Sequence, residues 1–445
     1  WSSDVCSSDL NTTPFQEGHF LLCWKTDEGV FLTGKGIRNM QQTARCSKRP
    51  LGIYLHIPFC IRKCLYCDFL SAPGDEQTKI EYVEALLHEI RAQAPLYDGH
   101  EVKTVFFGGG TPSLLSGEQI RRIMDCLHTV FSFSAEEGGA EVTMEANPGT
   151  LTPEKLADYR RAGINRLSIG LQSASDEELK ALGRIHTWKD FLCSYELARK
   201  EGFANINIDL MSALPGQTPG GWMETLEKTV RLKPEHISAY SLIIEEGTPF
   251  YEMYGEAAAP RGCKALPTEE EDRLMYGQTK VFLAEAGYGR YEISNYSLPG
   301  FACRHNISYW ERTDYAGFGL GAASLLENVR WSNTPDLRQY MEASGTAGLV
   351  TPLKQAVQHL SRQEQMEEFM FLGLRMTEGV SSRRFYREFH IPLEEVYREA
   401  LRKLMSEGLL VCGSGAAADG EDSRYRLTEW GIDVSNYALS EFLFA

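Results

Sequence analysis

The run "YLHIPFCIRKCLYCDFLSA" at residues 54–72 decides the fold, because it joins an apolar stretch to three closely spaced cysteines. Cys60, Cys64 and Cys67 follow a C-x3-C-x2-C spacing. Thiolates are soft ligands that select zinc, copper(I) or iron–sulfur clusters. A structural zinc site needs a fourth ligand, for which His56 is the nearest candidate. A [4Fe–4S] cluster held by only three cysteines keeps one iron open, and the spacing favours this interpretation.

Composition limits the class of protein. The chain has 445 residues, 43% of them hydrophobic, and a formal net charge of −16. This length predicts two or three domains. The acidic balance argues against a nucleic-acid partner, since phosphate binding needs a basic surface. The absence of an apolar run of about 20 residues predicts no transmembrane segment. Eleven cysteines without a disulfide-like framework predict a cytoplasmic protein. Peripheral membrane contact and a homodimer stay open.

Strand-like and amphipathic segments alternate after the cysteine run. The strand-like segments are 51–59, 102–107, 140–146, 164–170, 204–211 and 236–242. The first amphipathic segment carries an expected buried face made of Ile80, Val83, Leu86, Leu87 and Ile90. Proline after threonine at 152–153 and 218–219 indicates two helix starts. Six β-α units predict an α/β fold with a parallel sheet, and their regular spacing favours a partial (β/α)6 barrel.

The chain divides into four parts by pattern. Residues 1–39 lack periodicity, and we expect a non-native or disordered leader with Met40 as the native start. Residues 40–245 hold the barrel, and 246–355 form a connector with an α+β extension. Residues 356–445 predict a small winged-helix-like C-terminal domain.

Polar and small residues follow the predicted strands, where a barrel of this kind places its site. Glycines at 108–110 let a backbone approach a ligand closely, although a tight turn would also need them. An arginine at 184 could pair with a carboxylate or be an ordinary solvated charge. The other candidates at strand ends are Glu145, Gln172, Asp209 and Ala239.

These motifs together resemble the radical S-adenosylmethionine (SAM) superfamily, from about residue 50 to the C-terminus. The closest pattern is the subgroup around oxygen-independent coproporphyrinogen III oxidase. The resemblance implies a [4Fe–4S] cluster on Cys60, Cys64 and Cys67, with SAM on the open iron. In the superfamily an electron from the cluster cleaves SAM to a 5′-deoxyadenosyl radical. The implied SAM contacts are Tyr54, Phe69, Gly109, Gly110, Thr111, Glu145, Gln172, Arg184, Asp209 and Ala239.

Two features distinguish branches of this subgroup. The oxidase pattern has a further cysteine where this chain has Phe69. The run "RHNISYW" contains His305, Asn306, Tyr309 and Trp310 and resembles the H-N-x-x-Y-W motif of the haem-chaperone branch. The resemblance implies haem as a ligand, with His305 as axial donor and the aromatic rings as flat apolar surface.

The function that this resemblance favours is a haem chaperone that binds a cluster, SAM and haem and delivers haem to acceptor proteins. One alternative is oxidative decarboxylation of porphyrinogen propionates, and another is a radical SAM enzyme with a different substrate. No catalytic residue is assigned. His305 could also be a hydrogen-bonded core histidine. Ala323 stands where the branch usually has histidine, which puts the role of that position in doubt.

Overall fold

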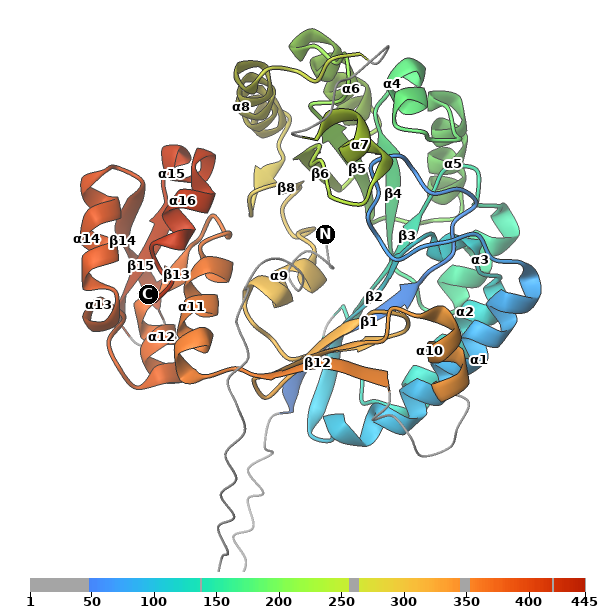
Figure 1. Cartoon of the computed structure of the whole chain (residues 1–445), viewed down its shortest axis with the longest axis horizontal. Coiled ribbons are helices and arrows are strands. Elements are labelled where there is room, and N and C mark those ends of the chain that lie inside the picture. The colour runs from blue at the N-terminus through green and yellow to red at the C-terminus, as the bar shows by residue number, and fades with distance from the viewer. Residues whose placement is uncertain (1–47, 137, 256–263, 345–352, 418–419, 445) are drawn as a thin grey trace, which may run out of the picture.

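A computed structural model describes residues 48–136, 138–255, 264–344, 353–417 and 420–444. Its main sheet has the strand order β12-β11-β10-β9-β1-β2-β3-β4-β5-β6-β8-β7. The six central strands are parallel and form an open, curved wall (Figure 1). They are β1 (Arg49–Ile57), β2 (His100–Gly109), β3 (Glu141–Ala146), β4 (Arg166–Gln172), β5 (Ile206–Ser212) and β6 (His236–Ser241). The predicted partial (β/α)6 barrel is confirmed.

Helices connect these strands and cover the outer face of the wall (Figure 1). They are α1 (Glu76–Gln93), α2 (Gly117–Val130), α3 (Pro153–Arg161), α4 (Asp176–Ala181), α5 (Trp188–Lys200) and α6 (Pro219–Arg231), with short 3-10 turns η1 (Ala94–Tyr97) and η2 (Pro112–Leu114). Thr152 and Thr218 cap α3 and α6 with their side chains, each followed by proline, so both predicted helix starts are confirmed.

One predicted core position in α1 is wrong. Ile80 is 46% exposed, whereas the other four residues of the expected face are buried. The buried stripe at the start of the helix runs through Lys79, Tyr82 and Val83 instead. Ile80 follows Lys79 by one residue, which rotates its side chain by about 100° around the helix axis and away from the buried stripe.

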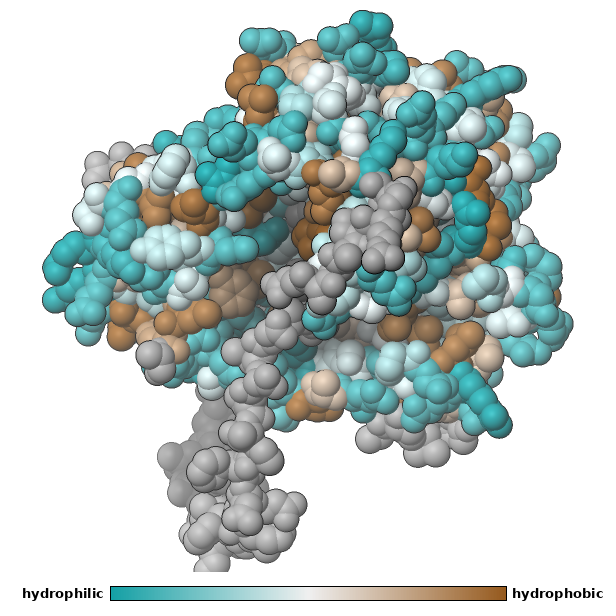
Figure 2. Space-filling model, turned by 45° about the horizontal axis from the view of Figure 1, so that its top comes forward, coloured by the Kyte–Doolittle hydropathy of each residue, from teal (hydrophilic) through white to brown (hydrophobic). Residues whose placement is uncertain are grey.

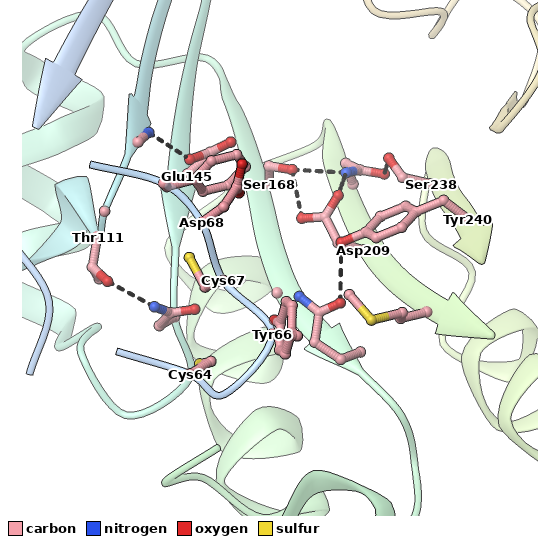
Figure 3. A pocket seen from close by; sticks show the side chains of 18 of the residues that line it. Cys64, Tyr66, Cys67, Asp68, Thr111, Glu145, Ser168, Asp209, Ser238 and Tyr240 are labelled. Carbon is pink, nitrogen blue, oxygen red and sulfur yellow. Dashed lines mark hydrogen bonds between the residues drawn. The ribbon is translucent and has the colours of Figure 1, made fainter. Parts of the chain in front are cut away.

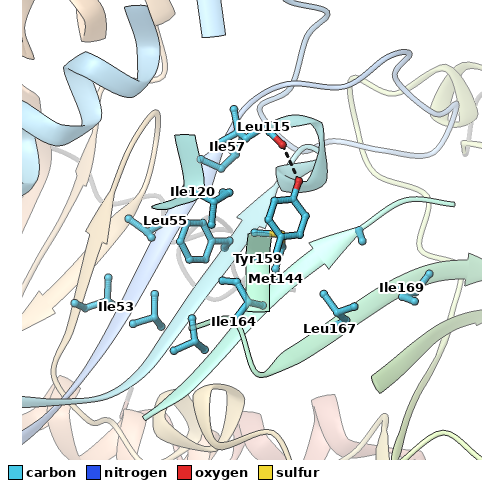
Figure 4. Packing of buried hydrophobic residues seen from close by; sticks show 14 of the residues in the cluster. Ile53, Leu55, Ile57, Leu115, Ile120, Met144, Tyr159, Ile164, Leu167 and Ile169 are labelled. Atoms are coloured by element: carbon cyan, nitrogen blue, oxygen red, sulfur yellow. Dashed lines mark hydrogen bonds between the residues drawn. The ribbon is translucent and has the colours of Figure 1, made fainter. Parts of the chain in front are cut away.

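Alternation along the parallel strands separates a core face from a site face. Figure 4 shows Ile53, Leu55 and Ile57 of β1 in one buried layer with residues of the neighbouring strands and helices. Tyr159 of α3 closes this layer by donating a hydrogen bond to the Leu115 carbonyl at 2.7 Å. Since side chains alternate across a strand, the intervening residues point to the concave side, where many of them are polar.

Segments from the predicted connector extend both edges of the sheet, together with β12, which crosses the boundary predicted at residues 355–356. On the β1 side lie β9 (Tyr315–Phe318), β10 (Ala323–Leu326), β11 (Val329–Asn333) and β12 (Lys354–His359), and on the β6 side β8 (Asn295–Ser297) and β7 (Gly289–Arg290). The connector also contains α7 (Pro249–Tyr254), α8 (Glu269–Glu285), α9 (Arg304–Trp310) and α10 (Leu337–Ser344). The connector therefore completes the sheet as well as linking two parts of the chain.

The C-terminal part has its own core and a three-stranded sheet of order β13-β15-β14. Its elements are α11 (Arg362–Gly373), β13 (Val380–Ser381), α12 (Ser382–Phe389), α13 (Leu393–Val396), α14 (Arg398–Ser406), β14 (Leu410–Ala417), β15 (Gly420–Leu427), α15 (Glu429–Asp433) and α16 (Ser435–Ser440). Helices followed by a strand hairpin agree with the predicted winged-helix-like arrangement. The exact domain boundaries stay predictions, and the predicted leader lies outside the described residues.

Helix α9 lies between the main sheet and the C-terminal helices (Figure 1). Just after it, Arg312 donates from Nε to Glu368 of α11 at 3.1 Å and from Nη1 to Glu388 of α12 at 2.7 Å. Arg330 of β11 pairs with the same Glu368 at 2.8 Å. Both arginine side chains and Glu368 are largely buried, so this network fixes the C-terminal part against α9 and the sheet edge.

Hydrophilic side chains dominate the face shown in Figure 2, and apolar side chains gather there in small separate patches. Across the described ranges, no helix is both long and apolar enough to cross a bilayer.

Candidate cofactor and ligand site

A cavity of about 240 Å³ lies on the concave side of the sheet, between α9 and the cysteine loop, which carries Cys60, Cys64 and Cys67. Fifteen of the site residues predicted from the sequence line it: Cys60, Cys64, Cys67, Phe69, Gly109, Gly110, Thr111, Glu145, Gln172, Arg184, Asp209, His305, Asn306, Tyr309 and Trp310. Tyr54 and Ala239 are buried and do not line the cavity. Tyr54 instead packs against Phe106 and bonds to His56 through its hydroxyl group.

Backbone hydrogen bonds fix the cysteine loop at its two ends and at its middle. Its two ends are joined where Cys60 N donates to the Ala72 carbonyl at 3.1 Å and Ala72 N donates to the Pro58 carbonyl at 2.9 Å. Halfway along, Leu65 N donates to the Leu182 carbonyl at 3.1 Å, and the Leu65 side chain packs on an apolar cluster that contains Leu182. These contacts hold the backbone of the loop, and with it the positions of the three cysteines.

The three thiols suit a cluster better than a zinc ion. Two thiolates on one zinc lie about 3.8 Å apart, since each Zn–S bond is about 2.3 Å. Within the described residues, no three His, Cys, Asp or Glu side chains converge closely enough to hold a single ion. His56, the candidate fourth ligand, has both ring nitrogens engaged, by the Leu70 carbonyl at 2.8 Å and the Tyr54 hydroxyl at 3.1 Å. A [4Fe–4S] cluster, which is larger than a single ion and would keep one iron without a protein ligand, fits these three thiols better.

A chain of hydrogen bonds joins two of the thiols through the strand ends. Cys60 Sγ lies 3.5 Å from the Thr111 hydroxyl, which accepts from Asn147 Nδ2 at 2.7 Å (Figure 3). Arg184 donates from Nη2 to Asn147 Oδ1 at 2.7 Å and from Nη1 to Cys64 Sγ at 3.6 Å. Sequence reasoning missed Asn147. Strand alternation could have indicated it, because Asn147 lies two residues after Glu145 and therefore points to the same face of the sheet.

Arg184 is held inside the cavity and is not a solvated helix charge. Its Nη2 also donates to the Gly170 carbonyl at 2.7 Å. Its Nε is buried and has no hydrogen-bond partner among the described residues. A guanidinium fixed in this way keeps donor capacity for a ligand carboxylate.

Two carboxyl groups line the cavity from β3 and β5, on either side of β4 (Figure 3). Glu145 accepts from Gly109 N at 3.1 Å, and burial, followed by the nearby charge of Asp209, raises its pKa to about 8. Asp209 accepts from Ser168 Oγ at 2.9 Å and from Asn207 Nδ2 at 2.7 Å, and burial raises its pKa. Both groups can accept hydrogen bonds from an ammonium or from sugar hydroxyls.

Gly109 and Gln172 have left-handed backbones beside the cavity. Gly109 has a φ of 104°, and a Cβ atom there would lie 2.5 Å from the His56 ring. A glycine is therefore required, and its backbone can lie close to a ligand. Gln172 has a φ of 70°, and its Oε1 accepts from the Tyr240 hydroxyl at 3.2 Å.

At the other end of the cavity, His305 is 1% exposed and hydrogen-bonded at both ring nitrogens. Nδ1 lies 2.8 Å from Thr104 Oγ1 and Nε2 lies 3.0 Å from the Tyr309 hydroxyl. The ring stacks on Phe106 at 5.1 Å between centroids. Burial, followed by the charge of Arg166, lowers its pKa to about 3, so the imidazole is neutral at physiological pH.

The rest of the H-N-x-x-Y-W motif faces both the cavity and the C-terminal part. Trp310 lines the cavity, and the guanidinium of Arg375, which follows α11, lies 4.5 Å from its ring centre. Ala323, where the branch usually has histidine, starts β10 and packs in the same cluster as Tyr309. A longer side chain at that position would therefore stand close to the motif.

Comparison with known proteins agrees with this geometry. Residues 54–229 match the radical SAM superfamily, and residues 360–415 match the HemN C-terminal domain. The chain is 35% identical over 396 residues to heme chaperone HemW of Lactococcus lactis subsp. lactis (strain IL1403), covering 89% of this chain and 98% of the relative. It is 36% identical over 390 residues to heme chaperone HemW of Bacillus subtilis (strain 168), covering 88% and 98%.

Among solved structures, coproporphyrinogen III oxidase (HemN) from Escherichia coli, a radical SAM enzyme, matches with a TM-score of 0.74 and 25% identity. The match covers 90% of this chain and 91% of that chain. The superfamily implies a [4Fe–4S] cluster and SAM, for which the three thiols and the surrounding polar groups are suited. The chain therefore belongs to the radical SAM superfamily and, within it, to the family of the heme chaperone HemW proteins.

Proposed function

We propose that this protein is a cytoplasmic haem chaperone, which binds haem in the cavity on the concave side of the sheet and passes it to an acceptor protein. The observation that carries this proposal is that the H-N-x-x-Y-W residues of α9 line the same cavity as the three cysteines. Nearly full-length similarity to relatives named heme chaperone HemW supports it.

At the cysteine end, Cys60, Cys64 and Cys67 would hold the cluster, whose open iron supplies a binding position for SAM. Arg184 would pair with the carboxylate of SAM through its unpartnered Nε edge. Glu145 would accept from the ammonium, and Asp209 from ribose hydroxyls. Each of these side chains is already oriented by a hydrogen bond to a neighbouring residue, so few rotamers must be fixed on binding.

At the α9 end, His305 suits the role of axial haem donor. A neutral imidazole has a lone pair on one nitrogen, and burial keeps His305 neutral by lowering its pKa. In the tautomer that donates from Nδ1 to Thr104, the lone pair is on Nε2, which now accepts from Tyr309. A ligating histidine usually keeps such a partner on its other nitrogen. Binding would require that the Tyr309 hydroxyl leave Nε2.

The second candidate is oxidative decarboxylation of coproporphyrinogen III, favoured by the structural similarity to HemN. Phe69 argues against it, because the aromatic ring lines the cavity where the oxidase pattern has a cysteine. A phenyl group can neither donate a proton nor ligate a metal. We therefore place the chaperone first.

The test is to reconstitute the cluster anaerobically and divide one sample. One half is titrated with haem, and the other is supplied with SAM, reductant and coproporphyrinogen III. We expect haem binding and no protoporphyrinogen IX. Decarboxylation without haem binding would contradict the chaperone and establish the oxidase.

A further inference from the structure

Arg166, the first residue of β4, is a buried cation that lines the cavity and has no close partner in the part of the chain that the structure describes. It is 2% exposed. Its Nε has no hydrogen-bond partner, and within the described ranges no hydrogen bond or ion pair reaches its guanidinium group. It shares the concave face of β4 with Ser168 and lies at the opposite end of the strand from Gln172. The free guanidinium therefore belongs to the α9 end of the cavity.

The acidic groups around Arg166 are engaged elsewhere. Glu141 accepts from the backbone N–H groups of Arg304 and His305, both at 3.1 Å, and so caps the start of α9. Asp209 accepts from two neighbouring side chains of the sheet. Both carboxylates lie near enough to act on Arg166 electrostatically, but neither comes within 4.0 Å of it. The side chain is therefore surrounded by polar groups without being paired.

The tyrosine beside Arg166 is engaged as well. The Tyr291 hydroxyl lies 2.8 Å from His236 Nε2 and accepts from Cys303 N at 3.2 Å. A buried guanidinium that keeps its charge loses hydration and is stabilised only by matching acceptors. Its planar fork is suited to a bidentate carboxylate. Because Glu141 and Asp209 stand nearby, a single carboxylate fits better than a doubly charged phosphate.

We propose that Arg166 forms a carboxylate-binding subsite at the α9 end of the cavity, and that it holds one propionate of the bound porphyrin. The assignment to porphyrin rests on the proposed function, whereas the subsite itself does not. The carboxylate of SAM is the other source of this chemistry, but Arg184 serves the cysteine end, next to Cys64. Arg166 would thus orient the porphyrin through one propionate, while His305 would be the donor to its iron.

The first experiment uses propionate as the probe, on the cluster-reconstituted protein. At tens of millimolar, sodium propionate should raise the melting temperature by about 2 °C over equal sodium chloride, because a ligand that binds only the folded state stabilises it. Arg166→Met should abolish this shift. Arg290→Met is the matched control, since Arg290 has a buried side chain paired with Glu429 outside the cavity, and it should keep the shift.

The second experiment compares haem with haem dimethyl ester. The wild type should bind the diacid at least about 10-fold more tightly, the lower range for a hydrogen bond to a charged group. Arg166→Met should lose this preference and keep its affinity for the ester. Arg166→Lys, which keeps the charge without the fork, should retain part of the preference. SAM affinity should be the same in all three proteins.

The two experiments separate the subsite from the function. An Arg166-dependent propionate shift without haem binding would support the subsite and contradict the chaperone. Equal propionate shifts in wild type and Arg166→Met would overturn the subsite, whatever the haem result. A loss of SAM affinity in Arg166→Met, with no change in ester preference, would overturn the assignment to porphyrin.

Discussion

Asn147 and Arg184 are hydrogen-bonded across the cysteine end of the cavity, with Arg184 Nη2 lying 2.7 Å from Asn147 Oδ1. Through this pair, the ends of β2 and β3 are connected to the loop that carries Cys64. Neither residue needs to be a cluster ligand to affect the cluster end. The pair fixes where the guanidinium stands relative to the thiols.

Asn147→Ala should weaken SAM binding about 10-fold, because Arg184 loses a hydrogen bond that orients it, and a hydrogen bond from a charged group contributes about 1.5 kcal/mol or more. Asn147→Asp should lose less, since a carboxylate still accepts from Arg184. Isothermal titration calorimetry of the reconstituted proteins with SAM checks both predictions. Asn165→Ala is the control, because Asn165 bonds to backbone at the start of β3, away from the thiols. Equal SAM affinity in all variants would remove Asn147 from the site.

Replacing any one of Cys60, Cys64 and Cys67 by alanine should abolish the cluster, since two thiolates cannot hold it at three corners. The wild type should carry about four irons per chain after anaerobic reconstitution. Iron analysis and the EPR spectrum of the reduced protein give the result. Cys193→Ser, at an exposed cysteine, should keep the full iron content. One zinc and no iron in carefully handled wild type would contradict the cluster.

His305→Ala should remove the axial donor and alter or abolish the Soret band of bound haem. Tyr309→Phe should keep histidine ligation and raise haem affinity, because the Tyr309 hydroxyl no longer competes for Nε2. Absorption spectra of the two variants with added haem are compared. Because His305 is buried and stacked on Phe106, iron content is measured first to show that each variant is folded. Identical haem spectra in His305→Ala and wild type would dismiss His305 as the ligand.

Glu145 should make the cofactor-free protein less stable as pH rises. Its pKa in the folded protein, about 8, lies above the ordinary value of 4.5 for a glutamate. Between these values the folded protein keeps a proton that the unfolded chain has released. The contribution of Glu145 to stability is therefore greatest below about pH 4.5 and falls as the pH rises towards 8. Melting temperatures of wild type and Glu145→Gln between pH 5.5 and 8.5 check this. The variant should lose less stability over that range, and parallel curves would contradict the shift.

The barrel was predictable because its signals are local. Six apolar strand segments and two Thr-Pro helix starts each specify their own element. Most cavity residues were also predictable, since they stand at strand ends that a parallel sheet brings to one edge. Ile80 was misplaced because periodicity cannot tell which neighbouring stripe a helix buries at its first turn.

What sequence could not supply was contact across distant segments. The pairing of β9 with β1 depends on residues more than 250 positions apart. The position of α9, which precedes β9, depends on this pairing. Asn147 and Arg166 carry no motif of their own, and their roles emerge only when the cavity is assembled. Tyr54 and Ala239 are among the SAM contacts that the resemblance implies, yet Tyr54 packs against Phe106 and Ala239 packs in the main core.

The most direct test of the central claim is a haem titration of anaerobically reconstituted wild-type protein, followed at the Soret band. A chaperone that carries haem in this cavity should saturate at about one haem per chain with an axial-histidine spectrum, while the cluster absorption persists. A linear, unsaturated rise that matches free haem in buffer would contradict the account.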